Sequence, residues 1–226
     1  MKLRQQTGFT LWELLVALLV VGIVFSFGVP NFREFQRNGA IIGAANDLVT
    51  GVLRARSEAV KRQVPVGLCL SDDPTAVTPT CSPNPIADSV TRGFVVWVDE
   101  NGNVDPNGIP ILTDGTDGNG VIDANEPVLM QSPPPGGSIE LSANCGYVAY
   151  APTGFTRDIV GLCNDATRAI LYCDDRGSRP SSGNLSSARV VQINRLGRGL
   201  VLQDDVDVTN ALAGDLAAVN PDCPDA

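Results

Sequence analysis

The residues best suited to chemistry are acidic and amide side chains gathered near the middle of the chain. They occupy residues 99–105 and 114–126, where aspartate, asparagine and glycine recur at short intervals. A calcium loop wraps several carboxylate and carbonyl oxygens around one ion, with a glycine at the tight bend and a late glutamate. The first position of that pattern falls on Gly115, and the flanks are predicted strands, which excludes an EF-hand. The segment therefore predicts either a calcium-binding β-loop or a solvated acidic hairpin loop. The candidate ligands are Asp117, Asn119, Asp123 and Glu126.

Enzymatic chemistry is poorly supported by the composition. The 226 residues include no histidine, which removes the commonest general base and the usual partner of a serine or cysteine nucleophile. Acidic pairs at 72–73, 174–175 and 204–205 fall in predicted turns, where solvated carboxylates are ordinary. We expect a protein that is not an enzyme and that has no cofactor, unless the acidic loop binds calcium.

The cysteines are candidates for structural disulfides. None of them lies in a Cys-x-x-Cys motif, so metal binding and redox catalysis are disfavoured. The sequence leaves their connectivity open. Cys69 with Cys81 is the pair that we favour, because it would staple a proline-rich loop to the first strand. The six candidates are Cys69, Cys81, Cys145, Cys163, Cys173 and Cys223.

A long apolar run near the N-terminus contains one charge. From Phe9 to Val29 there are 21 residues, and only Glu13 is charged. A helix of that length spans about 31 Å, roughly the hydrocarbon thickness of a bilayer. A carboxylate in a membrane costs about 2.5 to 3.5 kcal/mol, so it normally has a partner and a role. We predict a transmembrane helix. A cleaved secretory signal peptide and a plain anchor are the alternatives, although no small-x-small cleavage site follows the run.

A recognisable motif surrounds the start of this run. It consists of a basic leader, a small residue, an aromatic residue and a glutamate: Lys2, Arg4, Gly8, Phe9, Thr10, Leu11 and Glu13. The motif resembles the class III signal of type IV pilins and of type II secretion pseudopilins, with Trp12 where the family usually has an aliphatic residue. The resemblance implies that a prepilin peptidase cuts after Gly8 and N-methylates Phe9. It also implies that the Glu13 carboxylate neutralises the Phe9 amine of a neighbouring subunit during assembly.

Two helix-weakening residues lie further along the run. Gly22 and Pro30 lower the cost of bending or local unwinding, and Pro30 is expected to interrupt the helix. The resemblance gives Gly22 and Pro30 an assembly role, because the stretch between such residues is thought to melt in pilin filaments. A simple kink at the membrane surface is the alternative.

The helix is predicted to continue from Asn31 to Gln63 as an amphipathic segment. Its apolar residues recur at alternating steps of three and four. They are Ile41, Ala45, Leu48, Val52, Ala55 and Ala59. The helix end, residues 53–62, and the strand-like residues 64–69 resemble the GspH/FimT branch of minor pseudopilins and minor pilins.

Short β-type segments separated by turns follow the helix. They are predicted at 64–71, 93–98, 128–131, 138–142, 146–150, 168–173, 188–194 and 200–203, with loops at 72–89 and 177–187. No second helix of comparable length is predicted. The expected fold is α+β and type IV pilin-like, with a long N-terminal helix, transmembrane and then amphipathic, packed on an antiparallel β-sheet domain. The predicted parts are a leader at 1–8, a transmembrane and assembly helix at 9–29, an amphipathic half at 30–63 and a β-rich domain at 64–226.

The overall charge disfavours nucleic acid as a partner. A net charge of −9 repels phosphates at long range. DNA-binding members of the resembled branch share a C-terminal Gly-Arg-x-Arg hairpin, which here reads Gly197-Arg198-Gly199-Leu200 and lacks the second arginine. Arg189, Arg195 and Arg198 would form a small basic patch, and a plain hairpin turn is the alternative.

The resemblance implies a non-enzymatic minor pilin or pseudopilin. Such a subunit helps to initiate or cap a type IV pilus or a type II secretion pseudopilus at its tip, and the alternative is a DNA-binding minor pilin of natural transformation. Expected partners are other minor and major pilins or pseudopilins, prepilin peptidase and the inner membrane. The basic leader predicts a cytoplasmic N-terminus and the cysteines predict an oxidising, periplasmic location for the domain. The resemblance implies a single-pass protein of the bacterial inner membrane that reaches the filament tip after assembly.

Overall fold

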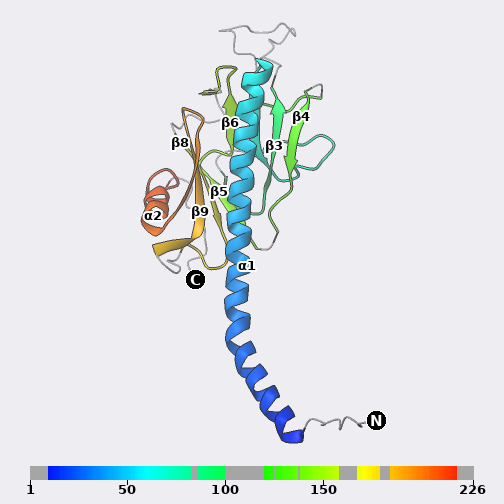
Figure 1. The fold of residues 1–226 in the computed structure, drawn as a ribbon. Coiled ribbons are helices and arrows are strands. Elements are labelled where there is room, and N and C mark those ends of the chain that lie inside the picture. The colour runs from blue at the N-terminus through cyan, green and yellow to red at the C-terminus, as the bar shows by residue number, and fades with distance from the viewer. Residues whose placement is uncertain are drawn as a thin grey trace, which may run out of the picture. The chain divides into compact units, whose positions relative to one another are not determined.

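The computed structural model describes residues 10–82, 86–99, 120–124, 126–136, 138–157, 167–178 and 184–217. The chain divides into two compact units, Met1–Gly39 and Ala40–Ala226. One helix, α1 (Leu11–Arg62), contributes residues to both units (Figure 1).

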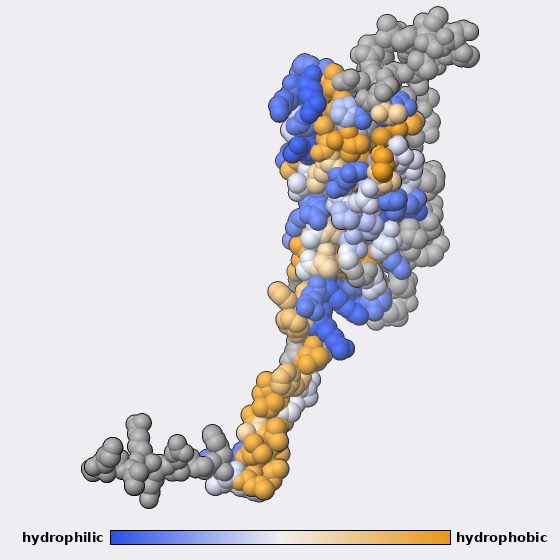
Figure 2. Space-filling view, turned by 90° about the vertical axis from the view of Figure 1, so that its right-hand side faces the viewer, coloured by the Kyte–Doolittle hydropathy of each residue, from blue (hydrophilic) through white to orange (hydrophobic). Residues whose placement is uncertain are grey.

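In the first unit, the apolar side chains of α1 are exposed. Leu11 and Trp12 keep 77% and 74% of their surface accessible, and hydrophobic side chains cover this part of the helix (Figure 2). α1 passes through Pro30 without a break, so the expected interruption of the helix at this residue does not occur. Among the residues that the structure describes, no helix is both long enough and apolar enough to cross a membrane.

In the second unit, one face of α1 is buried. The predicted stripe is confirmed, because its six members, from Ile41 to Ala59, are each no more than 1% exposed. Lys61 and Arg62 lie in the last turn, where cations favour the negative end of the helix dipole. Gln63 ends the helix with a φ of 59°, in the left-handed conformation common after a helix C-terminus.

The strands within the described residues form two five-stranded antiparallel sheets. Sheet A has the order β4 (Val128–Ser132), β3 (Gly93–Val98), β1 (Val66–Ser71), β6 (Tyr147–Tyr150) and β7 (Thr156–Arg157). Sheet B has the order β10 (Gly199–Asp204), β9 (Leu185–Asn194), β8 (Thr167–Cys173), β5 (Glu140–Ala143) and β2 (Ile86–Val90). Every predicted segment contains a strand. β2 and the start of β9 lie in regions predicted as loops, and β7 was not predicted.

The main core lies between α1 and both sheets. The buried stripe of α1 belongs to one hydrophobic cluster with Leu68 and Val96 of sheet A and Ile170 and Val191 of sheet B. This packing confirms the α+β fold with a helix on antiparallel sheets. Because apolar burial is the dominant favourable term in folding, this cluster is the main source of stability in the second unit.

A second core lies on the other face of sheet B. It contains Val208 and Ala211 of a short helix, α2 (Asp205–Ala213), together with Leu171 and Val190 of the sheet. Asp204 caps this helix, because its carboxylate accepts a hydrogen bond of 3.0 Å from the Val206 N–H. α2 was not predicted from the sequence.

Gly51 sets the close approach of α1 to sheet A. A Cβ atom at this position would lie 2.4 Å from the ring of Phe94, closer than real contacts allow. The absence of a side chain therefore lets the helix backbone lie directly on β3, as glycine does at close packing positions.

Candidate functional site

The first turn of α1 is closed by a reciprocal pair of residues. The backbone N–H and the hydroxyl of Thr10 each donate a hydrogen bond of 3.2 Å to Glu13 Oε2. In return, the Glu13 N–H donates to Thr10 Oγ1, also at 3.2 Å. This is a capping box, in which the two side chains satisfy N–H groups that have no partner inside the helix. The Glu13 carboxylate is therefore held at the start of α1.

The surroundings of Glu13 are apolar and exposed. Its neighbours Trp12, Leu14 and Leu15 each keep at least 51% of their surface accessible, and Glu13 itself is exposed. Exposed apolar surface of this extent marks a region that contacts another protein or a membrane. A carboxylate in such a region can pair with a cation once water has been excluded, and the pairing is then strong.

The other residues of the predicted assembly site stay predictions. Gly8 and Phe9 lie outside the described residues. Gly22 is helical, and a Cβ added there would have no neighbouring atom within 4 Å. Pro30 lies within α1.

The described part of the acidic segment forms a turn that is held by its own carboxylates. Asp99, fully buried at the end of β3, accepts two hydrogen bonds from the Gly120 N–H, at 3.1 and 3.3 Å, and one of 3.4 Å from the Tyr147 hydroxyl. Burial, together with Asp99, raises the pKa of Tyr147 well above its usual range. Glu126 Oε2 accepts a hydrogen bond of 3.0 Å from the Asp123 N–H. These carboxylates therefore organise backbone.

The calcium prediction falls partly outside the described residues. Asp117 and Asn119 lie in the range 100–119, which the structure does not describe. Within the described ranges, no three His, Cys, Asp or Glu side chains are placed to hold one metal ion. Calcium binding by Asp117, Asn119, Asp123 and Glu126 stays a prediction.

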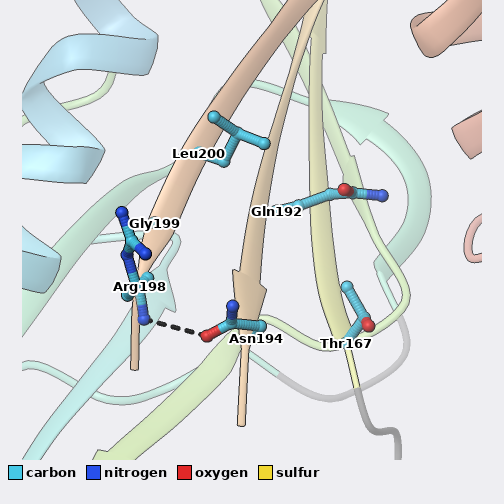
Figure 3. A pocket seen from close by; sticks show the side chains of 6 residues that line it. All are labelled: Thr167, Gln192, Asn194, Arg198, Gly199 and Leu200. Atoms are coloured by element: carbon cyan, nitrogen blue, oxygen red, sulfur yellow. Dashed lines mark hydrogen bonds between the residues drawn. The ribbon is translucent and has the colours of Figure 1, made fainter. Parts of the chain in front are cut away.

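A cavity lies beside the turn between β9 and β10, where the predicted site residue Arg198 is one of its lining residues. Asn194 Oδ1 accepts hydrogen bonds of 3.1 Å from the N–H groups of Leu196 and Arg198, and Gly197 adopts a φ of 73° that suits a glycine. A cavity of about 350 Å³ lies beside this turn (Figure 3). Its lining residues are Thr167, Gln192, Asn194, Arg198, Gly199 and Leu200.

The predicted patch of three arginines is not formed. Arg195 and Arg198 are exposed at the turn, but Arg189 is only 6% exposed. Its Nη1 donates hydrogen bonds to the carbonyls of Ser186 and Ala188. Burial and the nearby Arg176 lower the pKa of Arg189 from its ordinary value. Arg189 therefore has a structural role, and two exposed arginines remain at the turn.

The cysteines form disulfides, as their composition predicted. Cys69 and Cys81 are bonded, with Cα atoms 5.5 Å apart, which confirms the favoured pair. Cys145 and Cys173 are also disulfide-bonded, and no described cysteine is free. Cys163 and Cys223 lie outside the described residues.

A cluster of charges surrounds Glu58 near the end of α1. Glu58 accepts a hydrogen bond of 2.6 Å from Arg62 Nε, and Arg54 and Lys61 each lie 3.9 Å from its carboxylate. The hydrogen bond from Arg62 and the three positive charges lower the pKa of Glu58 against the opposing effect of burial. Residues four apart lie on the same face of a helix, which places Glu58 and Arg62 side by side.

Similarity to known proteins agrees with these features. Residues 3–29 match the prokaryotic N-terminal methylation motif, and residues 44–197 match the family of type II transport protein GspH. A stretch of 48 residues is 42% identical to the type II secretion system core protein G of Vibrio cholerae serotype O1, and it covers 21% of this chain and 33% of that protein.

Two crystal structures of the type IV minor pilin FimU of Pseudomonas aeruginosa are also similar. They share 14% identity with this chain, with TM-scores of 0.40 and 0.35. The first alignment covers 74% of this chain and 92% of FimU, and the second covers 71% and 90%.

The GspH match covers 154 residues, more than half of the chain, and the methylation motif precedes it in the order expected of a pilin-like subunit. The chain therefore belongs to the GspH family of type II transport proteins.

Proposed function

We propose that this chain is a minor, non-enzymatic subunit that helps to initiate or cap a type II secretion pseudopilus or a type IV pilus at its tip. The observation that carries the proposal is the Glu13 carboxylate, held at the exposed, apolar start of α1 by Thr10. The methylation motif directly around this carboxylate supports the same role.

Assembly would begin with processing of the leader. Prepilin peptidase would cut after Gly8 and N-methylate Phe9, so the mature chain would start four residues before Glu13. In the filament, the Phe9 amine of one subunit would pair with the Glu13 carboxylate of its neighbour. A buried pair that loses one member leaves an uncompensated charge, at a cost of about 3 to 5 kcal/mol.

Before assembly, the run from Phe9 to Val29 would lie in the inner membrane. Lys2 and Arg4 favour a cytoplasmic N-terminus under the positive-inside rule. The Cys69–Cys81 disulfide supports a periplasmic location for the sheet domain, because disulfides persist in oxidising compartments.

Replacement of Glu13 by alanine tests the assembly role. Glu13→Ala should leave the subunit in the membrane fraction of a host that carries the peptidase and the filament machine, but it should reduce incorporation into sheared filaments at least tenfold. Glu34→Ala is the matched control, because Glu34 is an exposed glutamate on the same helix outside the apolar run. Equal incorporation of the two variants would refute the role of Glu13.

A further inference from the structure

The edges of the two sheets differ in their ability to accept another strand. β4 lies between Pro127 and Pro133, β7 has two residues, and β2 has an irregular register. Prolines, short strands and irregularities all protect sheet edges from pairing. β10 has six residues, with no proline and no lysine, and its part from Gly199 to Gln203 is uncharged. Among the described strands, only β9 pairs with β10, so its other side is an edge of sheet B.

Hydrogen-bond alternation shows which backbone groups of β10 face that edge. The Asn194 N–H donates to the Arg198 carbonyl at 3.2 Å, and the register continues with Leu200 opposite Gln192 and Leu202 opposite Val190. In an antiparallel ladder, alternate residues exchange both hydrogen bonds with the partner strand. Leu200 and Leu202 therefore direct their N–H and C=O groups toward β9. Those of Gly199, Val201 and Gln203 point away from β9, and the register is regular as far as Leu202.

Cavities flank this strand on the face that carries α2. The cavity of about 350 Å³ in Figure 3 and a second of about 440 Å³ share Gln192 and Leu200 in their walls. Leu200 is 59% exposed, and Leu202 lines the second cavity. Both cavities include Gln192 of β9, so they lie over the face of the sheet next to an apolar centre formed by Leu200 and Leu202.

The two ends of this surface carry opposite charges. Arg198 lines the first cavity, and Asp207 and Asp215 line the second. Gln192 Nε2 donates a hydrogen bond of 2.8 Å to Asp215 Oδ2, which holds this carboxylate over the centre of the strand because Gln192 lies opposite Leu200; the acidic end is formed by Asp205 and Asp207, which follow β10 directly. The first turn of α2 contains two aspartates and its last turn contains no basic residue, so the second end is acidic.

We propose that β10 accepts an extended segment of a partner polypeptide as an additional antiparallel strand. Antiparallel pairing matches the rest of sheet B and is slightly more stable than parallel pairing. It places the N-terminal end of the segment at the acidic end of the surface and its C-terminal end at Arg198. The segment therefore carries a basic residue near its N-terminal end and an acidic residue near its C-terminal end, with apolar residues between them on the α2 face. Main-chain hydrogen bonds provide the affinity, and the charges at the two ends determine the orientation of the bound segment. The surface includes no residue of the first turns of α1, so the inference stands independently of the role of Glu13.

Two peptides of opposite charge order test this inference. The probe is fluorescent acetyl-Lys-Thr-Val-Thr-Val-Thr-Glu-amide, and the control carries the glutamate first and the lysine last. The full chain in detergent micelles should bind the probe at least threefold more tightly than the control. Amide exchange should slow at Gly199, Val201 and Gln203 when the probe is added. Equal affinity for both peptides, no saturable binding of either, or protection elsewhere would overturn the inference.

Charge variants identify the binding end. Arg198→Glu should weaken binding of the probe about threefold to tenfold and should strengthen binding of a peptide with lysine at both ends. Arg195→Glu is the matched control, because Arg195 is an exposed arginine of the same turn that does not line the cavity. Equal effects of the two variants would show a non-specific charge effect and overturn the proposal.

A backbone variant and a concentration series complete the test. Val201→Pro removes an N–H that faces the edge and should abolish binding, and Val201→Thr should retain it; if the proline variant does not fold, the arginine pair decides. Sedimentation over a range of concentrations tests whether the edge binds a second copy instead. Self-association that Val201→Pro blocks and that the probe does not affect would assign the edge to a second copy and overturn the proposed partner.

Discussion

Thr10 donates two hydrogen bonds of 3.2 Å to the Glu13 carboxylate, one from its backbone and one from its hydroxyl. The carboxylate therefore has an intrachain partner before any neighbouring subunit arrives. Pairing with an amine in a filament would exchange neutral donors for a charged donor, and charge-assisted hydrogen bonds are roughly twice as strong. The cap and the proposed intersubunit pair thus use the same carboxylate. A mutation of Thr10 that leaves Glu13 unchanged can separate these two roles.

Replacement of Thr10 by valine should remove the cap while keeping the carboxylate. The first turn of α1 should become less stable by about 1 kcal/mol, because a side-chain cap is lost. This loss should appear as faster amide exchange at Glu13, whose N–H loses its acceptor Thr10 Oγ1, and Thr10→Ser should retain the slow exchange. Incorporation into filaments should stay within about twofold of the unmodified chain, because Glu13 remains. A tenfold loss of incorporation in Thr10→Val would show that the cap itself is required.

Leader cleavage should depend on Gly8. A side chain at this position would crowd the bond that the peptidase cuts, so Gly8→Leu should accumulate the uncleaved chain. Intact mass of protein from a host with the peptidase should give a mature chain that begins at methylated Phe9. A mature chain that starts beyond Val29 would show an ordinary signal peptide and contradict the prediction.

Glu58 should make the stability of the second unit depend on acid pH. Its pKa is lowered in the folded chain by Arg62 and the neighbouring cations, so the unfolded chain binds a proton more readily. The contribution of Glu58 is present above the ordinary value of 4.5 and is lost as pH falls through the lower folded value. Thermal unfolding from about pH 7 to pH 3 should show that Glu58→Gln is less stable only at the higher pH. Glu34→Gln should show no such difference; an offset for Glu58→Gln that persists in acid would contradict this linkage.

The domain truncated before Asn31 should not retard DNA in a gel at physiological salt. Only Arg195 and Arg198 remain exposed at the hairpin, since Arg189 is buried. Leu200→Arg should strengthen any residual binding. Arg198→Gln should reduce its salt slope by nearly one unit, because one phosphate contact is lost. Micromolar binding by the unmodified domain, abolished by Arg198→Gln, would favour a DNA receptor over a purely structural subunit.

The periodicity of apolar residues was sufficient to predict the helix and strands that bury one continuous face. The stripe from Ile41 to Ala59 follows the helical repeat, and α1 packs in the second unit through those residues. β1 and β3 are buried along their whole length, and apart from Ser71 they contain no polar side chain. α2 was missed because it has nine residues, and valine, threonine and aspartate are weak helix formers. Its start signal was present in Asp204, but its stability comes from packing on sheet B.

The predicted patch of three arginines was wrong because positions that are close in sequence were expected to be close in space. Arg189 and Arg195 are six residues apart, and an extended strand rises about 3.3 Å per residue, so they are separated by about 20 Å. The strand prediction for 188–194 already implied that distance. The carbonyls that bind Arg189 come from Ser186 and Ala188, whose positions depend on the local backbone path. No periodic pattern contains that information. The spacing of Thr10 and Glu13 is that of a capping box, so the cap could have been predicted from the sequence. Only the pairing of Glu13 with an amine was predicted, because a carboxylate in an apolar run suggests a charged partner.

Burial in the main core begins at Ile41, whereas Leu11, Trp12 and their neighbours are exposed. A melting experiment on the single subunit will therefore be blind to most substitutions between Leu11 and Phe25, since side chains that are exposed before and after unfolding contribute little to the difference. A genetic screen that selects for stable protein would pass damaging variants of this segment, and a screen that selects for filaments would reject them. Comparison of the two screens along α1 would separate the positions that stabilise the fold of the subunit from the positions that are needed only for assembly.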